Sequence, residues 1–239
     1  MALELIKKKK IKNKIFKILE RTGTILKIYR SGKSPKIIKI ISVLKNFEEI
    51  IWFTRPDQWS FQALYTITRL YFGSLNDEQL DRFFGLVLVP RIQEGILKKK
   101  KICYHLYLTI NFSSSRPKLF FSSIIIPLCA SKTSSEKEAI IFGFIISKRS
   151  FPLDQIISIL VFLLKKTSFT SSQITIIRAI LAKNYNLPNK ILDFFVDFFY
   201  ENKQKIKFNK HKKCYLIFFK NYSTFLSHSE KKKLTKLMD

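Results

Sequence analysis

The chain has 239 residues, 46% of them hydrophobic and 26% charged, with a formal net charge of +27. This composition excludes a disordered chain, and 6 Gly and 7 Pro are few for a protein of many short strands and turns. The charge predicts a polyanionic partner, either nucleic acid or an anionic membrane surface. Because AT-rich codons favour the abundant Lys, Ile, Phe and Asn, mutational drift is an alternative origin for part of this charge.

The N-terminal third predicts two helical regions. Residues 3–20 combine lysines with a partial apolar stripe, which indicates a basic helix or a solvated terminus, and the lysine run within them resembles a nuclear-import signal. Residues 36–53 carry apolar side chains at helical spacing and predict one amphipathic helix. Pro35 precedes this helix, where its missing N–H does no harm, and Pro56 closes it.

The rest of the chain predicts further helices separated by short polar connections. Two helix starts have the capping-box spacing, in which a Ser and a Glu three residues later bond to each other's backbone N–H groups: Ser135 with Glu138, and Ser227 with Glu230. The latter box starts the last helix. The remaining helices are expected over residues 60–72, 77–89, 102–112, 118–130, 136–148, 152–166, 172–184, 188–200 and 210–226.

This series of helices predicts an all-α protein whose helices pack in pairs. Two arrangements fit, an irregular HEAT-like array of packed helix pairs and a compact multi-helix bundle. The 23 Phe and many Ile favour the array, because most helices then bury wide faces. Several prolines recur at loosely regular intervals, although no sequence word repeats with them.

The residue patterns predict a non-enzyme without a metal site or a cofactor. Gly32, Lys33 and Ser34 match only the end of a phosphate-binding loop, since the first Gly of that motif would fall at Lys27. The three Cys and three His show no common metal-ligand spacing, and the carboxylates are scattered. No apolar run reaches the ~18–20 residues that a membrane-spanning helix needs, and neither a membrane nor a small-molecule substrate is expected as a partner.

The basic clusters are the candidate functional residues. Arg30, Lys33, Lys36 and Lys39 surround a predicted turn and the first turn of the next helix, where cationic side chains and free N–H groups together suit phosphate. A solvated run of charge is the alternative for any one cluster. Further RNA contacts are predicted for Arg69, Arg91, Lys98, Lys99, Lys100 and Lys101.

The two tryptophans differ in their expected environment. Trp52 ends an apolar stripe and is expected to pack in the core. Trp59 lies in a turn, where packing in the core and stacking on an unpaired base are both open.

A colinear set of motifs extends over residues 25–235. It includes Tyr29-Arg30-Ser31-Gly32-Lys33, Thr54-Arg55-Pro56-Asp57-Gln58-Trp59, Val87-Leu88-Val89-Pro90-Arg91, Pro127-Leu128-Cys129 and Leu187-Pro188 with Asp193. This set resembles the bystin family, the assembly factors of small-ribosomal-subunit precursors. The resemblance implies a basic N-terminal arm over residues 1–24 and a bystin-like helical domain over residues 25–239.

The resemblance implies a HEAT-like fold and a non-catalytic ribosome biogenesis factor. Such a factor would bind pre-rRNA, a small-subunit ribosomal protein and other assembly factors during 18S rRNA maturation and subunit export. The implied location is the nucleolus and nucleus, and the cytoplasm on late precursors. Bystins also carry a long charged N-terminal extension and a C-terminal tail, and the sequence leaves open the functions that depend on those extensions.

Two functions other than RNA binding stay open, and the distribution of charged residues over the surface distinguishes the three. RNA binding predicts Arg30, Lys33 and Arg91 together with lysines on one face. A protein–protein scaffold whose charge is drift predicts scattered lysines and an exposed apolar groove. Attachment to a membrane surface predicts lysines that flank exposed Phe and Leu on one helix.

Overall fold

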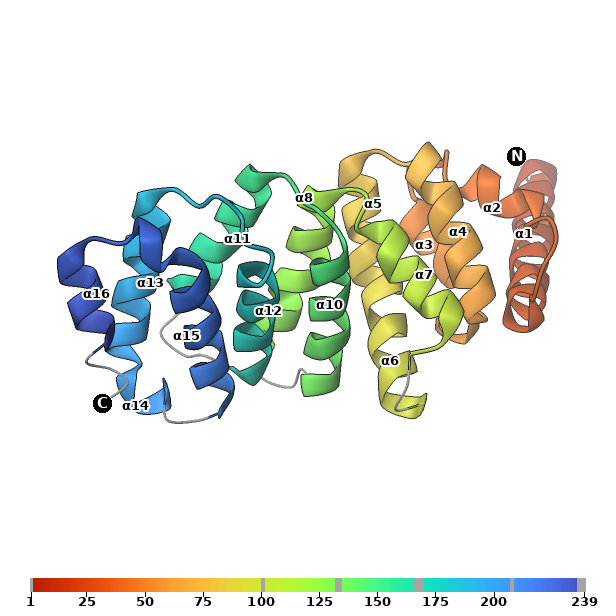
Figure 1. The fold of residues 1–239 in the computed structure, drawn as a ribbon. Coiled ribbons are helices and arrows are strands. Elements are labelled where there is room, and N and C mark those ends of the chain that lie inside the picture. Colours follow the sequence, from red (N-terminus) through yellow and green to blue (C-terminus); the bar gives the residue numbers. More distant parts are fainter. Residues whose placement is uncertain (1, 100–101, 132–134, 166–169, 207–208, 236–239) are drawn as a thin grey trace. The chain divides into compact units, whose positions relative to one another are not determined.

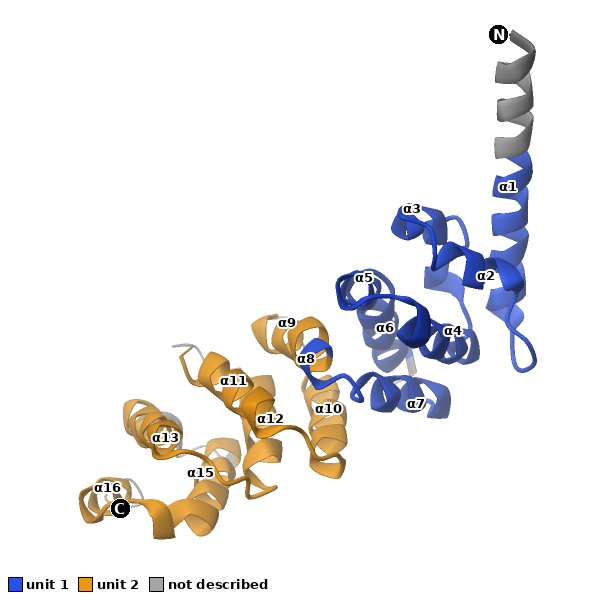
Figure 2. Cartoon of the chain, turned by 90° about the horizontal axis from the view of Figure 1, so that it is seen from above, with its two compact units in different colours: residues 1–119 blue, residues 120–239 orange. Residues whose placement is uncertain are grey.

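The computed structural model describes residues 2–99, 102–131, 135–165, 170–206 and 209–235, and every regular element in them is a helix (Figure 1). The predicted all-α class of paired helices is therefore confirmed. The chain divides into two compact units, residues 1–119 and 120–239 (Figure 2). The expected boundary between an arm and a domain, after residue 24, falls inside the first helix and stays a prediction.

Unit 1 has an aromatic core in which the edge of Tyr71 meets Phe83, with ring centroids 5.0 Å apart. The elements of unit 1 are α1 (Ala2–Ile28), α2 (Lys36–Ile41), α3 (Phe47–Trp52), η1 (Pro56–Gln58), α4 (Phe61–Ser74), α5 (Asp77–Phe83), η2 (Phe84–Leu88), α6 (Val89–Lys99), α7 (Tyr104–Ser113) and α8 (Pro117–Leu119). Near the end of unit 1, the guanidinium of Arg116 donates to the Asp77 carboxylate at 2.6 Å and to the Phe72 carbonyl at 2.7 Å. These bonds connect the segment after α7 to the end of α4 and the start of α5.

The single helix predicted over residues 36–53 is wrong, because the structure has two short helices there. α2 ends at Ile41, and the Ser42 hydroxyl then donates to the Lys39 carbonyl, a local bond that competes with continuation of the helix. α3 starts only at Phe47. The short helix α2 buries Ile38 and Ile41.

The helix expected to stop before Pro90 continues through it. The preceding turn, η2, is a π-helix in which the Val89 N–H bonds to the Phe84 carbonyl, five residues back. A wider turn accommodates the proline ring, which would clash with the backbone of a regular α-helix. The same arrangement recurs in unit 2, where the π-helix η3 (Phe120–Ile125) precedes Pro127 in α9 (Ile126–Ala130).

Unit 2 is an array of paired helices in two layers (Figure 2). α10, α12 and α15 form one layer, and α9, α11, α13 and α16 form the other. Besides η3 and α9, its elements are α10 (Glu136–Lys148), α11 (Leu153–Leu164), α12 (Ser171–Leu181), α13 (Asn189–Glu201), α14 (Lys203–Ile206), α15 (Asn209–Tyr222), η4 (Ser223–Phe225) and α16 (His228–Thr235).

The three helices of the first layer run parallel, since they begin at the same end of the unit (Figure 1). Lys210, in the first turn of α15, pairs with Glu136 of α10 at 2.5 Å and donates to the Ser171 hydroxyl of α12 at 2.9 Å. Their opposite ends therefore also lie together. No helix in the described part of the chain has a segment long and apolar enough to span a bilayer.

Candidate nucleic-acid interface

The predicted basic turn is a defined loop fixed to the body of unit 1. The Tyr29 hydroxyl donates to the Gly32 carbonyl at 2.5 Å, and Gly32 has φ of +100°, a conformation that favours glycine. The Ser60 hydroxyl, at the start of α4, donates to the Tyr29 carbonyl at 2.6 Å. The loop thus holds Arg30 and Lys33 on the surface in a fixed local frame.

The cations around this loop are exposed. Arg30 and Lys33 belong to the loop, and Lys36 and Lys39 to the short helix α2 that follows it. None of these four is paired with a carboxylate of the described residues. These four cations are thus available at the surface, and their contact with RNA stays a prediction.

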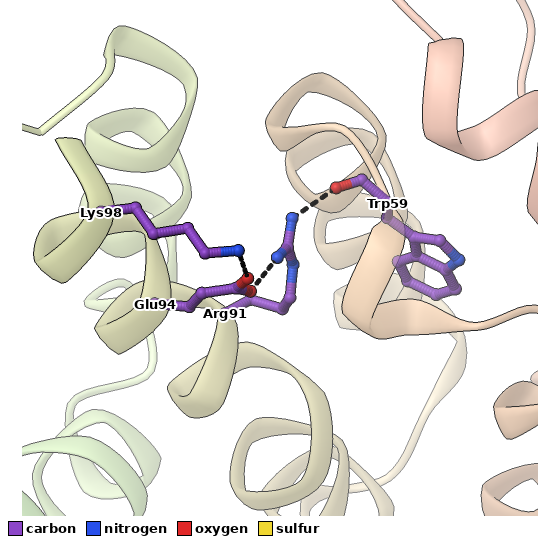
Figure 3. A network of polar contacts seen from close by, with 4 residues as sticks. All are labelled: Trp59, Arg91, Glu94 and Lys98. Carbon is purple, nitrogen blue, oxygen red and sulfur yellow. Dashed lines mark hydrogen bonds and ion pairs between the residues drawn. The ribbon is translucent and has the colours of Figure 1, made fainter.

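Arg91 is not part of that cluster, because its side chain is buried in unit 1 (Figure 3). Its guanidinium forms an ion pair with Glu94, donates to the Trp59 carbonyl at 2.6 Å and lies over the ring of Phe61 at 5.1 Å. The hydrogen bond from Lys98, followed by the charge of Arg91, holds the pKa of Glu94 below its usual value. Arg91 thus connects α6 to the turn before α4.

The other predicted contacts lie elsewhere in unit 1. Arg69 is exposed on α4, with its guanidinium over Tyr65 at 5.6 Å. Lys98 is exposed and paired with Glu94. The side chain of Lys99, and Lys100 and Lys101 as a whole, lie outside the described residues. RNA contact by any of these residues stays a prediction.

The two tryptophans lie in different environments. Trp59 is buried at 1% exposure, and its indole N–H donates to the Thr54 carbonyl at 3.0 Å, so this side chain belongs to the core. Trp52 is 48% exposed, and its expected place in the core is wrong. It lies in the last turn of α3, whose buried face is formed by Phe47 and Ile51 instead.

A second basic feature, which sequence reasoning missed, lies where α1 meets the corner before α4. A polar pocket of about 390 Å³ is lined by Glu20, Thr24, Lys27, Arg55 and Gln58. Arg55 has φ of +49°, a left-handed conformation that costs roughly 1–3 kcal/mol for a residue other than Gly. Such strain is common at functional sites, and the sequence holds no signal for it because a residue before Pro is expected to be extended.

Neither Arg55 nor Lys27 is paired with a carboxylate in the described part of the chain. Both are exposed, so the pocket offers two cations and the Gln58 amide beside the carboxylate of Glu20, a net charge of one positive unit. No group of three metal-ligating side chains gathers anywhere in the described residues. The exposed cations of unit 1 are suited to bind phosphate-like groups.

Comparison with known proteins identifies the family. The sequence model named Bystin matches residues 3–239. The chain is 34% identical over 227 residues to "Bystin" of Nematostella vectensis and 32% identical over 228 residues to "Bystin" of Homo sapiens; each match covers 94% of this chain and 52% of the relative. It is 34% identical over 185 residues to "Bystin" of Arabidopsis thaliana, 77% of this chain and 41% of the relative. The chain spans about half the length of these relatives, and it belongs to the Bystin family.

Proposed function

We propose that the chain is a non-catalytic ribosome biogenesis factor that binds the precursor of the small ribosomal subunit. Its partners are pre-rRNA, a small-subunit ribosomal protein and other assembly factors during 18S rRNA maturation and subunit export. It acts in the nucleolus and nucleus, and on late precursors in the cytoplasm. Membership of the Bystin family is the single observation that carries this proposal.

The net charge of +27 and the free cations of unit 1 support RNA as one partner. Arg30, Lys33, Lys36 and Lys39 contact phosphates from the loop and α2, and Lys27 with Arg55 contacts them from the pocket. Folded RNA is recognised mainly through its shape and backbone, and unpaired surface cations suit that mode of binding. Arg91 contributes indirectly, since it fixes α6 against the start of α4.

The protein–protein scaffold is the second candidate function. A scaffold is expected to have an exposed apolar groove, and unit 2 has such a groove between α10, α12 and α15. The two functions are compatible, because the free cations described above and the groove belong to different units.

Equilibrium binding to a fragment of small-subunit rRNA across a salt series tests the RNA contact. We expect log K to fall linearly with log salt, by about 0.7–0.9 per phosphate contact. The double variant Arg30→Glu/Lys33→Glu should flatten the slope by about 1.4–1.8, because two contacts are lost. The matched control, Lys165→Glu/Lys190→Glu, changes the same charge at exposed positions of unit 2 and should leave the slope nearly unchanged.

Two outcomes would contradict the RNA contact. One is weak binding at physiological salt that is equal for any polyanion. The other is an equal change of slope in both double variants, which would assign the binding to total charge and leave protein contacts as the route to the precursor.

A further inference from the structure

The apolar groove of unit 2 lies on the layer of three parallel helices. Its floor is made of the small residues Gly143, Thr175 and Ala179, and its volume is about 270 Å³. Ile140 and Phe144 of α10 form one wall, and each is 51% exposed. Ile217 of α15 contributes to the other wall. Half-exposed apolar side chains above a floor of small residues are typical of a surface that another protein covers.

Among the described residues that line the groove, Arg178 is the one with a charged side chain, and it is half-buried there. The three surrounding helices contain only two carboxylates, Glu136 and Glu138, both in the first turn of α10. Glu136 pairs with Lys210, and Glu138 accepts the capping bond from the Ser135 N–H. Arg178 lies at the other end, in the last turn of α12, so neither carboxylate is available to its guanidinium.

We propose that the groove binds a peptide segment of a partner protein that carries aliphatic side chains next to one carboxylate. The aliphatic side chains cover Ile140 and Phe144, and the carboxylate forms a bidentate pair with Arg178, whose planar fork matches it. Lys148, with its ammonium 5.5 Å from the centre of the Phe144 ring, adds positive charge at the rim. The charge of the groove thus complements an acidic segment.

A protein segment fits the groove better than RNA does. An RNA site combines several cations along a backbone track with aromatic faces for stacking, whereas this groove has one guanidinium among apolar and small side chains. The proposal gives the protein-binding part of the proposed function a defined surface. It uses residues of unit 2 only, so its failure would leave the RNA contacts of unit 1 untouched.

The test is selection from a library of random peptides displayed on phage, with the full chain as target and its Arg178→Glu variant as counter-target. We expect the selected peptides to share a carboxylate beside aliphatic residues. A synthetic copy should bind the wild type at least tenfold more tightly than Arg178→Glu, since a partly buried charge pair is lost. Replacing its carboxylate by the isosteric amide should cost a similar factor, and replacing it by lysine should restore binding to Arg178→Glu.

The apolar wall is tested by Phe144→Ser, with Phe225→Ser as the matched control because Phe225 is 61% exposed in η4, outside the groove. Urea unfolding shows whether each variant is folded, and Arg178→Gln replaces Arg178→Glu if the latter is not. The proposal is overturned if no peptide is selected, if Phe144→Ser and Phe225→Ser weaken binding equally, or if rRNA rather than peptide loses affinity in the Arg178 variant.

Discussion

Gly23 of α1 lies directly against the backbone carbonyl of Thr54: a Cβ on Gly23 would come within 2.5 Å of that oxygen. This close approach places α1 against the corner that contains Arg55. Glycine is required here by contact rather than by its own backbone conformation.

Gly23→Ala should therefore destabilise the protein by about 1–3 kcal/mol, because a backbone group must move. Gly73→Ala is the matched control, since nothing lies within 4 Å of its added methyl group, and alanine in a helix should stabilise by up to about 1 kcal/mol. Urea unfolding measures both. Equal effects of the two substitutions would show that the approach to Thr54 is not tight.

Arg91→Lys should cost about 1–3 kcal/mol in urea unfolding. Lysine cannot reach the Trp59 carbonyl and the Glu94 carboxylate at the same time, so a buried acceptor loses its donor. The salt slope of RNA binding should not change. Arg69→Lys, at an exposed position, should cost less than about 0.5 kcal/mol. If Arg91→Lys flattened the salt slope without loss of stability, Arg91 would be an RNA contact rather than a structural residue.

The two capping-box glutamates should respond to pH in opposite directions. Burial raises the pKa of Glu138, so its contribution to stability is present below about pH 4 and is lost as pH rises through its folded pKa. The Ser227 hydroxyl, followed by the Ser227 N–H, lowers the pKa of Glu230, whose contribution is present above about pH 4 and is lost as pH falls.

Glutamine can occupy either capping position without a charge. At pH 7, Glu138→Gln should raise the melting temperature and Glu230→Gln should lower it, and both differences should shrink toward zero in acid. Melting curves over roughly pH 3–8, which spans the titration of a carboxyl group, measure these differences. Shifts of the same sign in the two variants would contradict the assignment.

The three free thiols should react at different rates. Burial raises the pKa of Cys214 to about 12, and Cys129 is also buried, whereas Cys103 is only half-buried before α7. Since the thiolate is the reactive form, an aromatic disulfide reagent should modify Cys103 first in the native protein, and Cys103→Ser should remove the fast phase. A fast phase that survives this substitution would show that α15 opens readily around Cys214.

Local signals predicted the helices best where a cap defines the start. The bonds between Ser135 and Glu138 and between Ser227 and Glu230 are present as expected, and α10 begins at Glu136 as predicted. Such bonds join residues three apart, so the sequence contains the complete interaction. The break after α2 was missed because apolar spacing continues through residues 42–46 although the backbone leaves the helix.

The candidate site was predictable only in part. Exposed cations in a turn, such as Arg30 and Lys33, are recognisable from composition and spacing. Arg91 is buried where it donates to Trp59, 32 residues away, and Arg55 has a left-handed backbone although a residue before Pro is expected to be extended. Neither feature can be predicted from the adjacent residues, so the charge of a residue could not show whether it is a surface cation or a structural one.

The wide turn before Pro90 also sets the phase of everything that follows it in α6. One residue of an α-helix corresponds to about 100° of rotation, so an extra residue absorbed by η2 turns the next helix by that amount. Removing one residue from η2 would rotate Arg91 away from the Trp59 carbonyl. Glu94 and Lys98 would rotate by the same angle, because they lie on the same helix. In alignments of Bystin relatives, a one-residue gap at this turn would therefore be a change of helical phase rather than a harmless loop deletion.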